Sequence, residues 1–165
     1  PTQQDFHQAI GARSGAWYGA CLKITGSDSM AQDAVQEALV SAWSKRDQFH
    51  GDSRLETWIH RIAVNCALGA LRRMKPTDPW QHEHLVDESP SPADERHADE
   101  LGRDLESALA ALSELERVCF VLKHLEQWRL AEIAAHLDVK VDAVKQALVR
   151  ALRKLRTQMA HLKAG

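Results

Sequence analysis

The sequence has no long hydrophobic run. No apolar stretch approaches the roughly 20 residues that are needed to span a bilayer. The first ten residues, PTQQDFHQAI, lack both the basic start and the apolar core of a secretory signal. We therefore expect a cytoplasmic protein that does not insert into a membrane.

Cysteine is also scarce. Three cysteines occur, far apart and within helical patterns: Cys21, Cys66 and Cys119. Zinc sites usually use closely spaced Cys or His pairs, and secreted disulfide scaffolds carry a denser, even set. A further group of potential ligands lies in a polar segment without cysteine: His82, His84 and His97. We expect buried thiols, no metal site and no cofactor.

Motifs for catalysis are missing. There is no glycine-rich loop that would cradle a phosphate, and no pattern that combines a nucleophile, a base and an orienting group. The strict alternation of half-buried strands is missing as well, whereas apolar residues recur with a helical period. A hydrophobic content of 44% with 27% charged residues argues against global disorder. The sequence predicts an all-α protein that is not an enzyme.

The net charge of −2 gives no sign of a nucleic-acid partner until it is resolved along the chain. Residues 1–75 hold nine Lys and Arg against seven Asp and Glu, a net charge of +2. Residues 76–108 hold two against ten, a net −8, and residues 109–165 hold ten against six, a net +4. Two basic ends around an acidic middle are compatible with two nucleic-acid-binding regions.

All but one of the prolines lie between Pro76 and Glu100, in a segment rich in acids and poor in aliphatic residues. Proline lacks a backbone donor and disfavours helix in the residue before it, so residues 76–100 are predicted to form a flexible acidic linker. The linker separates two small helical domains, 1–75 and 101–165. The predicted helices are 3–24, 29–45, 53–74, 100–111, 114–125, 129–137 and 141–162. Ser113 and Glu116 form a capping box before the fifth of these.

The predicted helix 53–74 has two different faces. At about 100° per residue, one broad apolar face contains Leu55, Ile59, Ile62, Ala63, Cys66 and Ala70. A separate narrow stripe contains Arg54, Arg61, Asn65 and Arg72, with Trp58 beside it. Guanidinium groups, an amide and an indole on one face can hold phosphates, read base edges and stack an unpaired base. A solvated polar face with a half-buried tryptophan explains the same pattern equally well.

The predicted helix 29–45 has an apolar side made of Ala31, Ala34, Val35, Ala38 and Ala42. Its opposite side carries Asp33, Gln36, Glu37, Val40 and Ser44. Such a face suits a partner protein that presents Arg and Lys. Because exposed acids are common on protein surfaces, the pattern by itself favours a solvated face.

The last two predicted helices have the organisation of a helix-turn-helix. A short amphipathic helix is followed by a tight connection, Asp138 to Val141, and a longer helix whose apolar stripe is Val144, Leu148, Ala151, Leu155, Met159 and Leu162. The opposite face carries Asp142, Gln146, Val149 and Arg153, flanked by Lys145, Arg150, Lys154 and Arg156. A recognition helix needs one face for its own domain and one for the major groove. An ordinary helical hairpin is the alternative, but small residues that allow close helix crossing favour the helix-turn-helix: Ala131, Ala134 and Ala135.

These regions together resemble the extracytoplasmic-function sigma factors, the two-domain members of the sigma-70 family. The segment DAVQEALVSAW resembles the family's helix for binding core polymerase. The segment FHGDSRLETWIHRIAVNCALGALRR resembles its promoter-melting segment. The segment LSELERVCFVLKHLEQWRLAEIAAHLDVKVDAVKQALVRALRKLR resembles its second DNA-binding domain. The resemblance covers both domains in the expected order.

The resemblance implies an alternative sigma factor, which binds core RNA polymerase, recognises promoter DNA and promotes its melting. It implies contacts with the polymerase clamp by Asp33, Gln36, Glu37, Val40 and Trp43. For the promoter element nearer the transcription start, the start-proximal element, it implies base capture by the loop Asp47–Ser53 and contacts by Arg54, Trp58, Arg61, Asn65, Arg72 and Arg73. For the more distant, start-distal element, it implies contacts by Lys145, Gln146, Val149, Arg150, Arg153 and Lys154. It also implies an inhibitory anti-sigma protein as a frequent partner.

The sequence departs from the family's pattern at several positions. The acidic run that opens the core-binding helix is reduced to Met30-Ala31-Gln32-Asp33, which predicts weak intrinsic affinity for core polymerase. A Ser/Thr kinase would restore negative charge by modifying Ser29, Ser41, Ser44 or Thr57. In the helix-turn-helix, Arg129 replaces a usual Ser cap and Asp138 a usual Gly. Unusual promoter preferences are also expected, because alanines stand where the family has DNA-contacting Thr and Arg, at Ala143 and Ala147.

Two other functions are compatible with the sequence. A helix-turn-helix regulator would bind duplex DNA without polymerase, often as a dimer. A helical adaptor would bind no DNA at all. The polar stripe on the helix 53–74 favours the sigma factor, because a simple regulator needs no second nucleic-acid surface.

Overall fold

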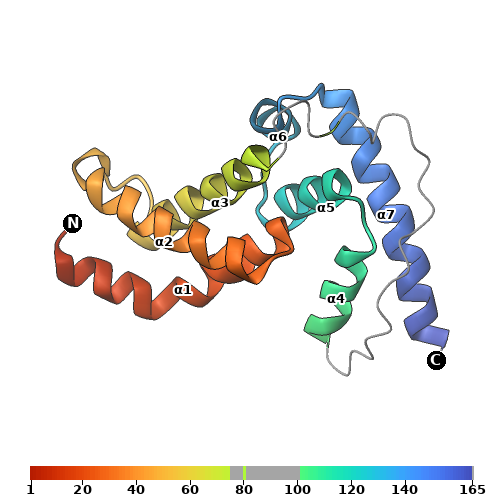
Figure 1. The fold of residues 1–165 in the computed structure, drawn as a ribbon, viewed down its shortest axis with the longest axis horizontal. Helices are drawn as coiled ribbons and strands as arrows, with labels where there is room; N and C mark the ends of the chain where they lie inside the picture. The colour runs from red at the N-terminus through yellow and green to blue at the C-terminus, as the bar shows by residue number, and fades with distance from the viewer. Residues whose placement is uncertain (75–79, 81–100, 165) are drawn as a thin grey trace. The chain divides into compact units, whose positions relative to one another are not determined.

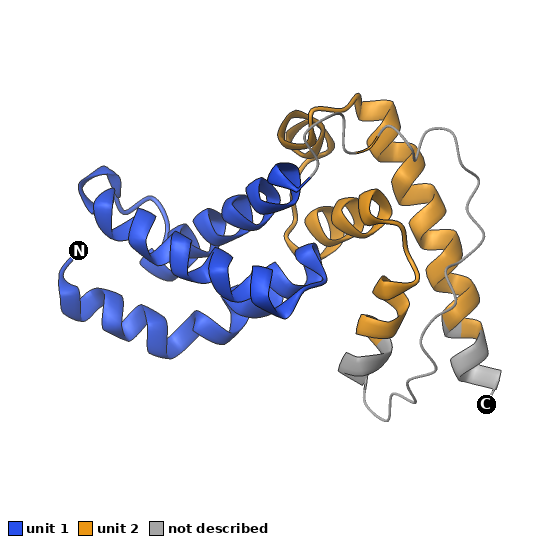
Figure 2. Ribbon diagram, viewed as in Figure 1, with its two compact units in different colours: residues 1–76 blue, residues 77–165 orange. Residues whose placement is uncertain are grey.

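The computed structural model describes residues 1–74, 80 and 101–164, apart from the side chains of 101–104, 159 and 161–164. All regular secondary structure in this part of the chain is helical (Figure 1), so the predicted all-α class is confirmed. The chain divides into two compact units, residues 1–76 and residues 77–165 (Figure 2).

Unit 1 is a three-helix unit in which each helix packs against the other two. Its helices are α1 (Gln3–Thr25), α2 (Asp28–Ser44) and α3 (Leu55–Arg73), with a short 3₁₀ turn, η1 (Arg46–Gln48), after α2. Gly26 ends α1 in the left-handed conformation, at φ 69°, which glycine adopts without steric cost. The Ser27 hydroxyl then accepts the backbone N–H of Met30 and caps α2. Two residues are therefore enough to join these helices.

The core of unit 1 combines small side chains on α2 with large ones on α1. The α2 face buries four alanines, each at most 2% exposed: Ala31, Ala34, Ala38 and Ala42. Opposite them, α1 buries Trp17 and Ile24. The Trp17 indole N–H donates to the Glu56 carbonyl at 3.1 Å, so the ring is buried without an unsatisfied donor. Small residues on one helix let the others approach closely.

The buried side of α3 is wider than its predicted apolar face. Leu55, Ile59 and Ala63 are buried as expected. Four further residues are also buried: Val64, Ala67, Leu68 and Leu71. The predicted members Ile62, Cys66 and Ala70 are only half-buried. The reason is that α3 packs against both α1 and α2, so the buried arc extends around the helix from one neighbour to the other.

Unit 2 contains α4 (Leu101–Ala110), α5 (Glu114–Phe120), α6 (Leu130–Leu137) and α7 (Val141–Ala164). The helix of α5 continues into a five-residue π-helical segment, η3 (Val121–Leu125). The long α7 packs against α4, α5 and α6. The predicted capping box is present, because Ser113 and Glu116 each accept the other's backbone N–H. This box fixes the start of α5 and the position of the Glu116 carboxylate.

The core of unit 2 is formed by the inner face of α7 together with α5 and α6. Val144, Ala147, Leu148 and Ala151 of α7 are buried, and Leu155 is half-buried. The side chains of Met159 and Leu162, also predicted for this stripe, lie outside the described residues. Ala147 is fully buried, so this position of α7 belongs to the core and not to the DNA-facing side.

Trp80 also belongs to unit 2. The sequence places it in the linker, yet its side chain is 1% exposed, and its indole N–H donates to the Leu137 carbonyl at the end of α6, at 3.1 Å. The rest of the segment 76–100, with His82, His84 and His97, lies outside the described residues. Trp80 is therefore integrated into the helix-turn-helix.

Candidate nucleic-acid and polymerase interfaces

The polar stripe predicted on α3 lies at the surface of unit 1. Arg54, Asn65 and Arg72 are exposed, and Arg61 is half-buried. The side chains of Arg54, Asn65 and Arg72 make no hydrogen bond or ion pair within the part of the chain that the structure describes. Because α1 and α2 cover the remaining sides of α3, these donors share one solvent-facing side. They are available for phosphates and base edges.

Trp58 lies beside this stripe and packs on an aromatic ring from the preceding loop. Its ring centroid is 5.2 Å from that of Phe49, with the planes inclined at 46°. Phe49 follows η1, so an aromatic pair connects α3 to the loop that is expected to capture a base. A ring held by a second ring loses little freedom when a base stacks on it.

A cavity of about 620 Å³ opens at the same end of unit 1. Its walls come from the start of α1, the loop before α3 and the start of α3: Pro1, Asp5, Gln8, Ala12, Phe49, His50, Gly51, Leu55 and Glu56. The backbone and hydroxyl hydrogen bonds from Thr2 hold the pKa of the Asp5 carboxyl below its usual value, so this group is ionised at neutral pH. Two carboxylates and no Lys or Arg in the lining disfavour a phosphate and favour an uncharged group such as a base. The sequence indicated the loop but not the α1 wall.

The outer face of α2 combines acids with exposed apolar side chains. Asp33, Gln36 and Glu37 are exposed, Val40 is 69% exposed and Trp43 is 39% exposed. The periodicity predicted the first four on this face, and the family resemblance implied Trp43 as a further polymerase contact. Their mixture of carboxylates and apolar surface is typical of a protein-binding site.

Trp43 is held in place by neighbours that the periodicity does not reveal. Phe6 of α1 meets its ring edge to face, with centroids 5.1 Å apart. The Arg46 guanidinium lies 4.1 Å above the same indole, and its Nη1 donates to the Trp43 carbonyl at 2.8 Å. The cation over the ring and the edge contact below fix an exposed aromatic side chain.

The first turn of α2 shows where the family's acidic run is depleted. Asp28 is the acid of this turn, and it accepts hydrogen bonds from the Tyr18 hydroxyl and from the Gln32 amide. Met30 is half-buried next to them. The next acids along the helix are Asp33 and Glu37, and both are exposed. Of the proposed acceptors of a phosphate, Ser29, Ser44 and Thr57 are exposed, and Ser41 is half-buried.

An ion pair connects the two faces of unit 1. Arg73, predicted to contact DNA, lies with Nη2 3.6 Å from a carboxylate oxygen of Glu37, predicted to contact the polymerase. Both side chains are more than half exposed, so the pair contributes little stability. Cys66 next to it is half-buried, unlike the buried Cys21 and Cys119 and contrary to the prediction, because it borders the covered arc of α3. Burial, followed by the charge of Glu37, raises the pKa of its thiol against the opposing effects of Arg73 and Lys45.

In unit 2, α6, a tight turn and α7 form the predicted helix-turn-helix. Asp138 closes α6 in the left-handed conformation, at φ 56°, where the family's pattern has glycine. Arg129 is the N-cap of α6 and makes no side-chain capping bond, as expected from the missing Ser. On α7, the residues of the predicted DNA-facing side are exposed: Asp142, Lys145, Gln146, Val149 and Arg153. Val149 is 56% exposed, an apolar surface that suits a thymine methyl group.

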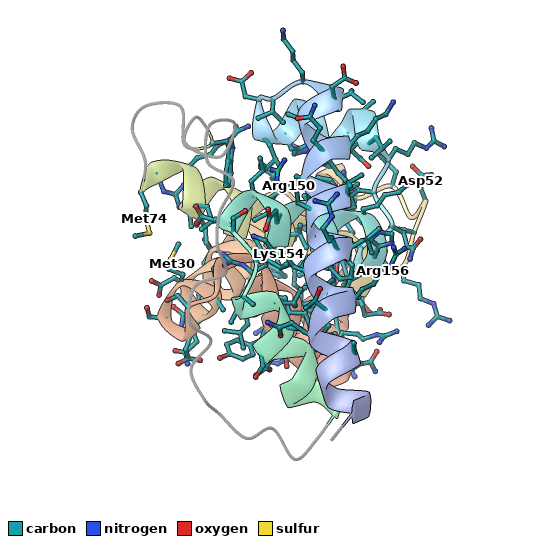
Figure 3. The ribbon with its side chains drawn as sticks, turned by 90° about the vertical axis from the view of Figure 1, so that its right-hand side faces the viewer. Met30, Asp52, Met74, Arg150, Lys154 and Arg156 are labelled. Carbon is teal, nitrogen blue, oxygen red and sulfur yellow. The ribbon has the colours of Figure 1, made fainter. Side chains whose placement is uncertain are left out.

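Two of the predicted DNA-binding residues of α7 point to the interior of the unit. Arg150 Nε lies 2.9 Å from Glu116 Oε2, and Lys154 Nζ lies 2.7 Å from Glu116 Oε1. In Figure 3 both side chains project to the α5 side of α7, whereas Arg156 projects to the opposite side. Glu116 is 2% exposed. The sequence suggested Glu116 only as a capping residue, and nothing in its local pattern indicates the two cations.

The charge of Glu116 is stabilised despite its burial. Burial raises the pKa of this carboxyl, but the hydrogen bonds from Lys154, the Ser113 backbone and Arg150 outweigh it and lower the pKa below its ordinary value. Glu116 is therefore ionised at neutral pH and holds α7 against α5.

The order of these surfaces agrees with the comparison to known families. Residues 12–77 match the family described as Sigma-70 region 2, and residues 102–155 match Sigma-70, region 4. The ECF RNA polymerase sigma-E factor of Escherichia coli K12 is 33% identical over 130 residues, which cover 72% of this chain and 68% of that protein. The chain belongs to the ECF sigma factors.

The chain covers different fractions of the length of other family members. SigG of Mycobacterium tuberculosis H37Rv is 35% identical over 163 residues, which cover 83% of this chain but only 44% of SigG. SigW of Bacillus subtilis 168 is 27% identical, with 88% of this chain and 83% of SigW covered. The chain thus spans less than half of one similar sigma factor and most of another.

Solved sigma factors share the fold. The sigma factor RpoE, in its complex with the anti-sigma factor NepR from Bartonella quintana, gives a TM-score of 0.60 at 22% identity, over 95% of this chain and 98% of that one. CnrH, in complex with the cytosolic domain of CnrY, gives 0.53 at 23% identity, over 97% and 90%.

Two further features are absent from the described residues. No helix among them is long and apolar enough to cross a membrane. Nor does any group of three or more His, Cys, Asp or Glu side chains in these residues have an arrangement that would hold a metal ion.

Proposed function

We propose that this chain works as an alternative sigma factor: it binds core RNA polymerase, recognises promoter DNA at two elements and promotes its melting. The polymerase, and not this chain, carries out the chemistry. The observation that carries the proposal is the presence of two separate surfaces suited to nucleic acid in one ECF family member, on α3 of unit 1 and on α7 of unit 2. A regulator that binds duplex DNA alone would not need the first.

The α3 surface is assigned to the start-proximal element. Arg54, Arg61, Asn65 and Arg72 lie on one side of the helix, and Trp58 is held beside them by Phe49. Flipping a base out of the stack costs a few kcal/mol, which stacking and backbone contacts offset. The neighbouring cavity has acceptors for a base, and its lining contains no Lys or Arg side chain for a phosphate. The loop Asp47–Ser53 and the start of α1 would together enclose the flipped base.

The α7 surface is assigned to the start-distal element. Lys145, Gln146, Val149 and Arg153 stand on its exposed side, with Arg150 at the edge. Basic residues there give orientation and salt-sensitive affinity, while amide and apolar side chains give preference for particular bases. Lys154 is assigned to the interior of unit 2, because Glu116 binds its ammonium group.

The outer face of α2 is assigned to the core polymerase. Its acids Asp33 and Glu37, with the exposed Val40 and Trp43, suit a basic partner that also carries apolar side chains. The depleted first turn supports a weak intrinsic affinity, which a phosphate on Ser29 from a Ser/Thr kinase would raise by adding negative charge next to Asp28. An anti-sigma protein is a further proposed partner, since the solved sigma factor RpoE, which shares this fold, is in complex with the anti-sigma factor NepR.

The test is transcription with core polymerase on a library of promoter fragments, with and without this chain. We expect transcripts that depend on both. Asn65→Ala should reduce them about tenfold, because a lost amide contact to a base removes about 1–3 kcal/mol of discrimination. The control is Glu106→Gln, at an exposed acid of α4 outside the proposed surfaces; it should transcribe normally.

The same assay separates the other functions. A helix-turn-helix regulator would bind duplex promoter DNA equally well without core polymerase, and Asn65→Ala would leave that binding unchanged. An adaptor would bind neither. The absence of any core-dependent transcript, including from a variant with acids restored by Met30→Glu and Gln32→Glu, would refute the proposed function.

A further inference from the structure

The strongest unexplained feature is the contact between one buried acid and two cations of the recognition helix. Glu116 belongs to α5, while its partners lie 34 and 38 residues later on α7. Its side chain is 3% exposed, against 27% for Arg150 and 18% for Lys154. Ser113 also donates its backbone N–H to Glu116 Oε1, at 3.0 Å. The carboxylate is thus fixed from three directions before any DNA is bound.

The two cations are bound in different ways. Lys154 has a single ammonium group, and Glu116 binds it. Arg150 donates only its Nε to Glu116, so its two Nη groups have no partner within the described residues. A guanidinium held through Nε keeps the pair of terminal donors that binds two acceptors side by side. Arg150 therefore remains able to make a bidentate contact.

The position of Arg150 on α7 is suited to such a contact. It lies four residues, about one helical turn, after the exposed Gln146, so the two residues share a side of the helix. Figure 3 shows Arg150 projecting toward α5, and its side chain is partly exposed. Its fork of donors matches the O6 and N7 acceptors of guanine in the major groove.

We propose that Glu116 is a positioning residue: it holds Arg150 so that the two Nη groups of this side chain read a guanine of the start-distal element. This inference rests on the proposed function of α7. A free arginine side chain loses rotamer freedom when it binds a base, and a side chain that is already oriented loses less. Glu116 does not touch the DNA itself, and it acts through Arg150.

The experiment is a double-mutant cycle with Glu116→Gln, Arg150→Ala and the double variant, each assembled with core polymerase. Gln keeps the shape and the capping role of Glu116 but has one oxygen for three donors. Transcription and binding are measured on promoter fragments that carry each of the four base pairs at every position of the start-distal element. We expect both single variants to lose about tenfold in preference for guanine at one and the same position. The double variant should lose no more than Arg150→Ala alone.

Each other outcome overturns the inference. If Glu116→Gln weakens binding equally on all sequences, or weakens it further in the Arg150→Ala background, Glu116 only supports the fold. If it strengthens binding, Glu116 withholds Arg150 from DNA. The control Glu106→Gln removes an exposed acid of α4 and should change no base preference.

A second variant keeps the test decisive if Glu116→Gln does not fold. Arg150→Lys retains a cation for Glu116 but has no fork of donors, so it should lose the guanine preference while its thermal midpoint stays unchanged. An unaltered preference in this variant overturns the inference. If the unmodified chain supports no core-dependent transcription, the proposed function fails. If the unmodified chain transcribes but the Glu116 and Arg150 variants do not behave as expected, only the inference is overturned.

Discussion

The two units hold their surface cations differently. In unit 1 the buried polar residue among those described is a threonine, Thr25, and Arg54 and Arg72 of the α3 stripe have no side-chain partner there. In unit 2 the buried polar residue is a charged one, Glu116, and it binds Arg150 and Lys154 of α7. The α3 surface is therefore adjustable, whereas part of the α7 surface is fixed before DNA arrives. An intact duplex presents its bases in fixed positions, so a surface that is oriented in advance suits it.

The largest expected effect tests whether Trp80 contributes to the core of unit 2. Trp80→Ala should lower the free energy of unfolding of unit 2 by about 3–5 kcal/mol, because it leaves a large cavity and an unpaired Leu137 carbonyl. Unit 1 should be unaffected. Hydrogen exchange measured by mass spectrometry resolves the two units, and faster exchange is expected in α6 and α7.

The matched control is Trp43→Ala in unit 1, whose ring is 39% exposed. It should alter exchange much less, and only in α1 and α2. Exchange in α6 and α7 that is no faster in Trp80→Ala than in Trp43→Ala would show that Trp80 does not contribute to the core of unit 2.

The next largest effect is the dependence of the stability of unit 2 on acid pH. The folded-state pKa of Glu116 is lowered, so its contribution to stability is complete above the ordinary pKa of 4.5 and is lost as the pH falls through the lower folded value. At neutral pH, Glu116→Gln should lower the free energy of unfolding by about 2–3 kcal/mol, as expected for hydrogen bonds to a charged group. The difference from the unmodified chain should shrink as the pH falls below 4.5. Urea unfolding at a series of pH values measures this.

Glu106→Gln provides the comparison, since Glu106 is exposed on α4. Its unfolding free energy should follow that of the unmodified chain at every pH. A stability difference for Glu116→Gln that is independent of pH would mean that the charge of Glu116 does not stabilise unit 2.

Much of the fold followed from the sequence because helical periodicity and caps are local. The helix predicted at 29–45 is Asp28–Ser44, and the one predicted at 129–137 is Leu130–Leu137. The exposure of Asn65 and Gln146 followed from the same periodicity, since each lies opposite an apolar stripe. Residues whose role depends only on their own helix were therefore predictable.

Residues whose role depends on a distant helix were not. The partners of Glu116 lie 34 and 38 residues away, and they meet it only because α5 packs against α7. Trp80 stands among prolines and acids, where nothing local indicates burial. The α1 wall of the cavity in unit 1 arises in the same way, from a helix that is distant in sequence. A periodic pattern separates two faces of a helix, but it does not tell which edge residues turn inward.

A smaller effect concerns the turn of the helix-turn-helix. Asp138 has a φ of 56°, a conformation that glycine adopts without the penalty of a Cβ. Asp138→Gly should therefore raise the free energy of unfolding of unit 2 by about 0.5–1 kcal/mol. The matched variant Asp142→Gly, in the first turn of α7, should lower it by about 1 kcal/mol. Thermal unfolding of both variants measures the pair, and a loss of stability in Asp138→Gly would contradict the expected strain.

The smallest expected effect concerns the caps at the beginnings of the helices. Thr2, Ser27 and Ser113 cap α1, α2 and α5 with their side chains. The N-cap residues of α3 and α6 are Arg54 and Arg129, and neither makes a side-chain capping bond. Both arginines are exposed. Arg54 stands before α3, which carries one proposed DNA surface, and Arg129 stands before α6, which precedes the other on α7. Arg129→Ser should therefore raise the free energy of unfolding of unit 2 by about 0.5 kcal/mol through a new cap.

The same substitution should weaken DNA binding if the arginine replaces a cap in order to contact a phosphate. The plot of log affinity against log salt concentration should then lose about one unit of slope, with no change in base preference. Arg129→Lys keeps the charge without a cap and should retain both the stability and the slope. A gain in stability with an unchanged slope would show that Arg129 is only a missing cap, and the first helix of the helix-turn-helix would then contribute no charged phosphate contact at its start.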